Sequence, residues 1–135
     1  PSNFQLRVLR SHSGRGLFAQ ERIPKGSLIV EYVGRPATAK QIRENRGKYL
    51  FWTSDVSMID GNVPANIARF INHSCAPNCE SRIRNRRIYI FALRTIQPGE
   101  ELSYDYGEEI LIFSWLELPL REVLGRMQRL RIGSM

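Results

Sequence analysis

Cysteine is scarce in this sequence: only Cys75 and Cys79 occur among its 135 residues. Two thiols are too few for the disulfide framework of a small secreted domain, and no secretory apolar segment accompanies them. We therefore expect a reducing compartment and two ordinary buried thiols. An apolar core must hold the fold together, and a chain of this size buries roughly two thirds of the surface that it exposes when unfolded.

Long hydrophobic runs are missing as well. The longest apolar stretches, such as residues 88–93 and 110–113, fall far short of the roughly 20 residues that cross a bilayer. We therefore expect a soluble protein that folds as one globular unit.

Acidic residues are in the minority, with 13 Asp and Glu against 20 Lys and Arg, which gives a net charge of +7. Such a charge favours contact with polyanions, nucleic acid above all, because each neutralised phosphate releases a counterion. A solvated basic face is the alternative interpretation. A basic peptide substrate would need a local acidic groove, for which the sequence offers Glu31, Asp60, Glu100, Glu101, Asp105, Glu108 and Glu109.

Short apolar segments separated by turn residues fill most of the chain. Their periodicity predicts strands over residues 4–8, 28–33, 49–53, 56–60, 79–84 and 87–93, a loop over residues 11–16, and short helices over residues 37–45 and 65–71. The last two strands form a predicted hairpin about Asn85. Many short strands with little helix indicate a mostly β, β-rich α+β fold.

Two polar stretches interrupt this pattern about thirty residues apart. They are residues 69–79, RFINHSCAPNC, and residues 99–107, GEELSYDYG. Each places amide, carboxyl, imidazole or phenol groups between apolar runs. We therefore expect two strand-to-loop junctions that meet at one pocket.

These stretches resemble the signature pair of the SET-domain protein lysine methyltransferases. The resemblance extends to residues 13–19, 31–34, 49–51 and 59–60 and covers roughly residues 6–107 in the family's order. It implies the SET fold, in which several small sheets surround a pseudoknot. The domain would comprise residues 1–110, and residues 111–135 would form a C-terminal lid or helix. Apolar residues recur there at helical spacing beside a basic face, so this helix either docks on its own domain or meets a partner or second copy, as in a homodimer.

The resemblance implies transfer of a methyl group from S-adenosylmethionine to the ε-amine of a protein lysine, with a histone tail as substrate and S-adenosylhomocysteine as product. It implies the nucleus and chromatin, or a host nucleus for a microbial or viral protein, with the cytoplasm as second choice. It places Tyr106 at the central catalytic position and Tyr49 on the wall of the lysine channel. Tyr104 stands where the family has Phe or Tyr, and a Tyr there narrows the channel, which predicts mainly monomethylation.

The cofactor contacts that the resemblance implies are Gly14, Arg15, Gly16, Arg69, Phe70, Asn72 and His73. No cysteine follows Cys79, so we expect a compact form without the cysteine-rich zinc segment that closes over the cofactor in many relatives. No zinc is expected, because the ligand set His12, His73, Cys75 and Cys79 fits no common structural spacing. Phe113 or Trp115 is predicted to cover the adenine instead.

Two other functions fit parts of the sequence. A basic nucleic-acid or chromatin-binding module without catalysis would use the basic tail and the arginines at the tip of the predicted hairpin, where DNA or a nucleosome would make contact. A cysteine hydrolase would pair Cys75 with His73. We disfavour the hydrolase because residues two positions apart rarely bring a thiol and an imidazole within hydrogen-bonding reach.

Overall fold

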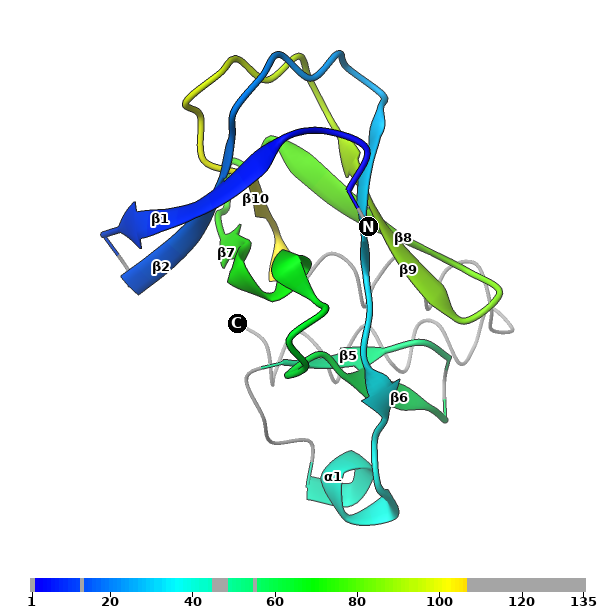
Figure 1. Ribbon diagram of the computed structural model, residues 1–135. Helices are drawn as coiled ribbons and strands as arrows, with labels where there is room; N and C mark the ends of the chain where they lie inside the picture. Colours follow the sequence, from blue (N-terminus) through cyan, green and yellow to red (C-terminus); the bar gives the residue numbers. More distant parts are fainter. Residues whose placement is uncertain (1, 13, 45–48, 55, 107–135) are drawn as a thin grey trace.

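The computed structural model describes residues 2–12, 14–44, 49–54 and 56–106, and every structural statement below refers to them. These residues form several small sheets with little helix (Figure 1). The prediction of a mostly β fold is therefore confirmed. The proposed segment of residues 111–135, with Phe113 and Trp115, lies outside the described residues.

Three of the sheets are antiparallel. The first pairs β1 (Leu6–Ser11) with β2 (Gly14–Ala19); the second has the order β3 (Leu28–Tyr32), β9 (Arg87–Ala92), β8 (Cys79–Arg84); and the third has the order β4 (Arg35–Pro36), β6 (Met58–Asp60), β5 (Leu50–Trp52). The fourth sheet is a parallel pair between β7 (Asn72–His73) and β10 (Ser103–Tyr104). The helices are α1 (Ala39–Glu44) and the 3-10 turn η1 (Ile67–Phe70).

The β8–β9 hairpin confirms the prediction of a turn at Asn85. Asn85 and Arg86 have φ values of 51° and 62°, and two consecutive left-handed residues match the twist of the flanking strands. Ile88 and Ile90 are fully buried, whereas Tyr89 between them is half-buried. Only one face of this almost wholly apolar strand is therefore fully buried.

The start of α1 follows from a reciprocal cap. The Gln41 backbone N–H donates to Thr38 Oγ1 at 3.1 Å, and the Thr38 N–H donates to Gln41 Oε1 at 2.7 Å. Two backbone donors that the helix leaves without partners are thereby satisfied. Thr38 is therefore the N-cap of the helix that the sequence predicts over residues 37–45. No helix in the described part of the chain is long and apolar enough to cross a membrane.

The loop predicted over residues 11–16 is wrong, because β2 already begins at Gly14. Gly14 pairs directly with Ser11, and of the two glycines beside Arg15 only Gly14 has a positive φ, 109°. The sequence pattern hid this strand because its buried apolar side chains, Leu17 and Ala19, come after the two glycines.

The core joins the small sheets into one body. Its fully buried apolar side chains include Leu17, Ile23, Ile29, Ile71, Ile88, Ile90, Ile96 and Leu102. Residues 99–102 run along the free edge of β2, where the Leu102 N–H donates to the Leu17 carbonyl at 2.8 Å. The chain then passes directly into β10. The same segment thus connects the β1–β2 hairpin to the β7–β10 pair.

Candidate functional site

The two polar stretches meet through the β7–β10 pair, as predicted. Asn72 pairs with Ser103 and His73 with Tyr104 in parallel register. The Ser74 N–H extends the contact by donating to the Tyr104 carbonyl at 3.2 Å. Side chains from both stretches therefore share one end of this small sheet.

A row of aromatic rings leads from this junction into the core. The ring centroids lie 4.8 Å apart for Tyr106 and Tyr104, 6.4 Å for Tyr104 and Phe51, and 5.0 Å for Phe51 and Tyr32. The Tyr32 hydroxyl donates to the Tyr49 carbonyl at 2.9 Å, so the main chain of Tyr49 lies at the inner end of the row. Tyr104 is 5% exposed and Tyr106 is 40% exposed. The row therefore forms an apolar wall that ends in a solvent-accessible phenol.

Three contacts fix Tyr106. Its hydroxyl donates to the Ile71 carbonyl at 2.5 Å, and its backbone N–H donates to His73 Nδ1 at 3.1 Å. The His73 and Tyr106 rings pack edge to face with centroids 5.2 Å apart. Because the hydroxyl proton points at a main-chain carbonyl, the phenol oxygen can present its lone pairs to a donor such as an amine.

The tautomer of neutral His73 follows from these contacts. Nδ1 accepts the Tyr106 N–H, so the ring proton must be on Nε2. Nε2 lies 3.5 Å from Cys75 Sγ and therefore donates to the sulfur. This thiol and imidazole therefore lie within hydrogen-bonding reach, and the prediction that their spacing keeps them apart is wrong. The pair is still unsuited to hydrolysis, since the nitrogen facing the thiol has no lone pair to take its proton.

The two thiols differ in environment, which corrects the expectation that both are buried. Cys75 is exposed, whereas Cys79 is buried and donates to Asn78 Oδ1 at 3.3 Å. Burial raises the pKa of the Cys79 thiol to about 12. A backbone hydrogen bond with Ser103 and the charge of Arg94 lower this pKa, but by less than burial raises it. Cys79 thus stays a neutral thiol that packs in the core.

We expect a thiol-specific disulfide reagent to titrate one thiol per native chain and two per denatured chain at about pH 8. Cys75 should react first, because Cys79 is shielded and its raised pKa suppresses the thiolate. The unfolded thiol ionises near its ordinary value of 9.0, so stability should fall as pH rises from about 9 towards 12. A Cys75→Ser variant should show no fast thiol. Two fast thiols in the native parent would contradict this.

The predicted cofactor residues of the hairpin and of β7 lie together. Asn72 Nδ2 donates to the Arg15 carbonyl at 2.9 Å and to Glu101 Oε2 at 2.8 Å. Asn72 thus ties the segment of residues 14–16 to the β7–β10 pair. The amide oxygen Oδ1 accepts no hydrogen bond from the described residues and can serve as an acceptor for a ligand.

Arg69 and Phe70 are held in a different way. The Arg69 guanidinium donates from one nitrogen to the Val63 and Asn66 carbonyls, both at 2.9 Å, and lies 4.4 Å over the Phe70 ring. These contacts brace the loop that enters η1. Arg69 therefore stabilises this loop. Its contact with the cofactor is a prediction that these interactions do not test.

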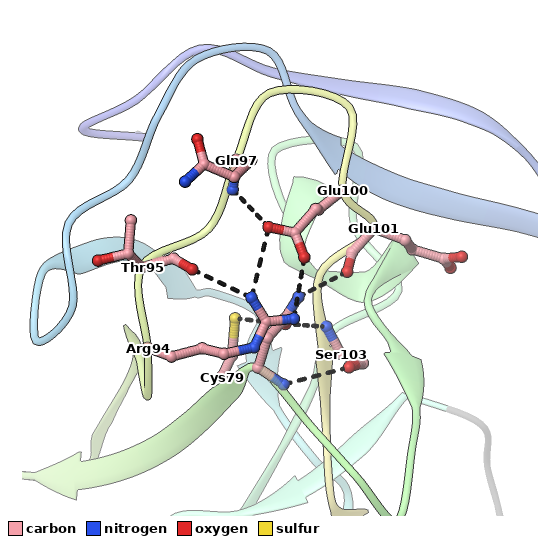
Figure 2. A network of polar contacts seen from close by, with 8 residues as sticks. Cys79, Arg94, Thr95, Gln97, Glu100, Glu101 and Ser103 are labelled. Carbon is pink, nitrogen blue, oxygen red and sulfur yellow. Dashed lines mark hydrogen bonds and ion pairs between the residues drawn. The ribbon is translucent and has the colours of Figure 1, made fainter.

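The acidic side chains expected to line a groove are engaged by separate neighbours. Glu31 forms a bidentate ion pair with Arg87. Glu100 forms a bidentate ion pair with Arg94, in which Arg94 Nη2 lies 2.9 Å from Glu100 Oε1 (Figure 2). The Arg94 guanidinium, followed by the Gln97 N–H, lowers the pKa of the Glu100 carboxyl. Glu108 and Glu109 lie outside the described residues. Within the described ranges, no group of three or more His, Cys, Asp or Glu side chains is placed to hold a metal ion.

Sequence reasoning missed two buried amides that position the site. Asn78 Nδ2 donates to the Glu101 carbonyl at 2.8 Å, and its Oδ1 accepts the Ser103 N–H at 2.9 Å. Asn66 is fully buried; its Oδ1 accepts the Val33 N–H at 3.1 Å and its Nδ2 donates to the Gly61 carbonyl at 3.0 Å. An asparagine among apolar residues is the sequence feature that could have indicated a buried amide. The sequence alone does not identify the groups that such an amide binds.

The chain belongs to the SET domain family, because the SET domain matches residues 14–107, and its several small sheets are consistent with the SET fold. Among its relatives, a protein of Chaetomium globosum named histone-lysine N-methyltransferase, H3 lysine-4 specific, is 46% identical over 117 residues. That match covers 77% of this chain and 11% of the relative. Human histone-lysine N-methyltransferase 2B is 44% identical over 105 residues, which are 69% of this chain and 4% of the human protein.

A solved structure gives the same fold. The crystal structure of the Chaetomium thermophilum polycomb repressive complex 2 matches with a TM-score of 0.68 and 26% identity, over 76% of this chain and 15% of the matched one. The present chain therefore spans only a small part of each of these proteins.

Proposed function

We propose that the chain transfers a methyl group from S-adenosylmethionine to the ε-amine of a lysine in a histone tail. The observation that carries this proposal is the junction of β7 and β10, where Asn72, His73, Tyr104 and Tyr106 converge in a SET domain. The relatives named histone-lysine N-methyltransferases support the substrate class, and the name of the Chaetomium globosum protein, H3 lysine-4 specific, supports lysine 4 of histone H3 as the first candidate. This substrate also favours the nucleus and chromatin as location.

The residues at the junction suit the chemistry of an amine nucleophile. A lysine amine has a reference pKa near 10.4, so producing its neutral form at pH 7 costs about 4.6 kcal/mol. The apolar rings of Tyr104 and Phe51 disfavour the ammonium by desolvation. The Tyr106 oxygen can accept a hydrogen from the amine and thereby orient its lone pair towards the methyl group. We place Tyr49 on the channel wall, next to this row.

The donor and acceptor groups of the hairpin and β7 fit S-adenosylmethionine. Asn72 Oδ1 faces away from its two acceptor partners and can accept from the cofactor's ammonium group. Main-chain groups of residues 14–16, with His73, Arg69 and Phe70, complete the proposed binding residues. When bound, the cofactor supplies a methyl group on a positively charged sulfur. We further propose that residues 111–135 form the lid, with Trp115 over the adenine.

The direct test is incubation of the chain with labelled S-adenosylmethionine and a panel of histones and nucleosomes, followed by mapping of the modified lysine. Label on a histone H3 tail supports the proposal. A chain that binds the cofactor in calorimetry but labels no lysine-containing protein would contradict it.

We propose that Tyr104 limits the product mainly to one methyl group. In this proposal the Tyr104 hydroxyl narrows the lysine channel beside Tyr106, whose ring centroid lies 4.8 Å from that of Tyr104, and a methylated amine needs extra space there. A Tyr104→Phe variant should raise the ratio of di- and trimethyl to monomethyl product by roughly 10-fold. Such a change corresponds to lowering the activation free energy of the second methyl transfer by about 1.4 kcal/mol. Mass spectrometry of a peptide substrate measures this ratio. The matched variant Tyr89→Phe, on the β3–β9–β8 sheet, should leave the ratio unchanged, and an unchanged ratio in Tyr104→Phe would exclude this role.

Binding of DNA or nucleosomes is a second proposal, which rests on the net charge of +7 and on the hairpin tip. Arg84 and Arg86 are exposed there, while Arg82 and Arg87 are paired with Glu80 and Glu31. Salt-dependent binding of duplex DNA without methyl transfer would favour the non-catalytic module. We also propose a homodimer through the C-terminal segment. Analytical ultracentrifugation tests this by measuring the mass of the protein in solution.

A further inference from the structure

Glu101 lies where two parts of the proposed site meet. Its backbone forms a bridge with Phe18 of β2, and two residues later the chain enters β10. Figure 1 shows the β1–β2 hairpin beside the β7–β10 pair, so this segment spans the junction between them. The backbone course alone therefore brings the Glu101 side chain close to both elements.

Both carboxylate oxygens of Glu101 are used, one for each element. The Ser11 hydroxyl at the end of β1 donates to Oε1 at 2.9 Å, and the Asn72 amide on β7 donates to Oε2 at 2.8 Å. These partners lie 90 and 29 residues away in the sequence. Hydrogen bonds to a charged acceptor are the stronger ones, so this carboxylate clamps the hairpin to β7.

The clamp fixes which way the Asn72 amide points. Its two neighbours, the Arg15 carbonyl and the Glu101 carboxylate, are both acceptors. Only the NH2 group can face them, and turning the amide over would set oxygen against oxygen twice. The Asn72 carbonyl oxygen is thereby held towards the opposite side, where a ligand can use it.

The Glu101 carboxylate occupies the space that a side chain at position 16 would need. A Cβ atom on Gly16 would lie 2.3 Å from Glu101 Oε2 and 2.8 Å from its Cδ. Its φ is not in the left-handed region, so space rather than backbone freedom requires glycine here. Gly16 and Glu101 therefore form a complementary pair, in which a larger residue at position 16 displaces the clamp.

We propose that Glu101 is a positioning residue, which holds Asn72 and the β1–β2 hairpin in the arrangement that binds the cofactor. This inference rests on the proposed function. It adds to that function a residue that touches no reacting atom and acts through Asn72, with Gly16 as its steric counterpart.

The test compares binding of S-adenosylhomocysteine to the full chain by calorimetry. Glu101→Ala should weaken binding by roughly 10-fold while the KM for a lysine peptide stays unchanged, because both hydrogen bonds of the clamp are lost. Glu101→Gln should retain most of the affinity, since its oxygen can accept from Asn72 and its NH2 can donate to Ser11. Glu80→Ala, which removes a half-buried carboxylate paired with Arg82, is the matched control and should bind as the parent does.

Gly16→Ala supplies an independent arm. In the parent it should weaken binding by roughly 10-fold, but in the Glu101→Ala background it should add little, because the group that it displaces is gone. Additive losses would overturn the inference, as would Glu101→Ala binding as tightly as the parent or Glu101→Gln losing as much as Glu101→Ala. A parent that binds no S-adenosylhomocysteine would instead overturn the proposed function, and this inference with it.

Discussion

Replacing Tyr106 by phenylalanine is expected to reduce methyl transfer by about 100-fold or more while leaving cofactor affinity nearly unchanged. The variant loses one oxygen atom, whose proton is engaged by the Ile71 carbonyl and whose lone pairs we assign to the substrate amine. The phenylalanine ring preserves the packing against Tyr104 and His73 at centroid distances of 4.8 and 5.2 Å. Single-turnover rates with a lysine peptide, together with calorimetry of S-adenosylhomocysteine, measure the two effects separately.

The matched change is Tyr89→Phe, which removes a phenol oxygen from the β3–β9–β8 sheet and should leave the rate within about 2-fold of the parent. Tyr106 is 40% exposed, so the loss of its hydrogen bond should cost little folding stability. A Tyr106→Phe variant that methylates within about 3-fold of the parent would show that this phenol does not orient the amine. A large loss of cofactor affinity would move Tyr106 from catalysis to cofactor binding.

Much of the fold could be predicted because the signals are local. The β8–β9 hairpin follows from two short segments on either side of Asn85, of which the second is almost wholly apolar, and α1 follows from Thr38 and Gln41, which are three positions apart. The meeting of the two polar stretches was expected because each places polar groups between apolar runs, but no local pattern encodes the parallel pairing of strands about thirty residues apart.

The rest depends on contacts between residues far apart in the sequence. Gly16 was predicted to lie in a loop, but it lies in β2, and the Glu101 carboxylate leaves no space for a side chain there. Glu31 was assigned to an acidic groove, but Arg87, 56 residues later, neutralises it. Chemical type and spacing identify candidate residues, and only the tertiary structure shows which partner each one has.

Replacing Asn66 by alanine is expected to lower the free energy of unfolding by roughly 2–6 kcal/mol. Asn66 is fully buried and satisfies the Val33 N–H at 3.1 Å and the Gly61 carbonyl at 3.0 Å. Alanine leaves both main-chain groups without these partners in the interior, and each unsatisfied group costs about 1–3 kcal/mol. Such a loss is a large share of the 5–15 kcal/mol that typically stabilise a domain. Urea denaturation followed by circular dichroism measures it.

The paired control is Asn62→Ala, the same chemical change at an exposed position four residues earlier, which should shift the unfolding free energy by less than about 0.5 kcal/mol. Asn66→Asp keeps the acceptor for Val33 but turns a carboxylate oxygen towards the Gly61 carbonyl, so it should also destabilise strongly at neutral pH. Because Asn66 precedes η1, which leads into β7, loss of this amide should also loosen Asn72 and weaken cofactor binding. If Asn66→Ala unfolds at the same urea concentration as Asn62→Ala, this amide does not hold the entry to β7 in place.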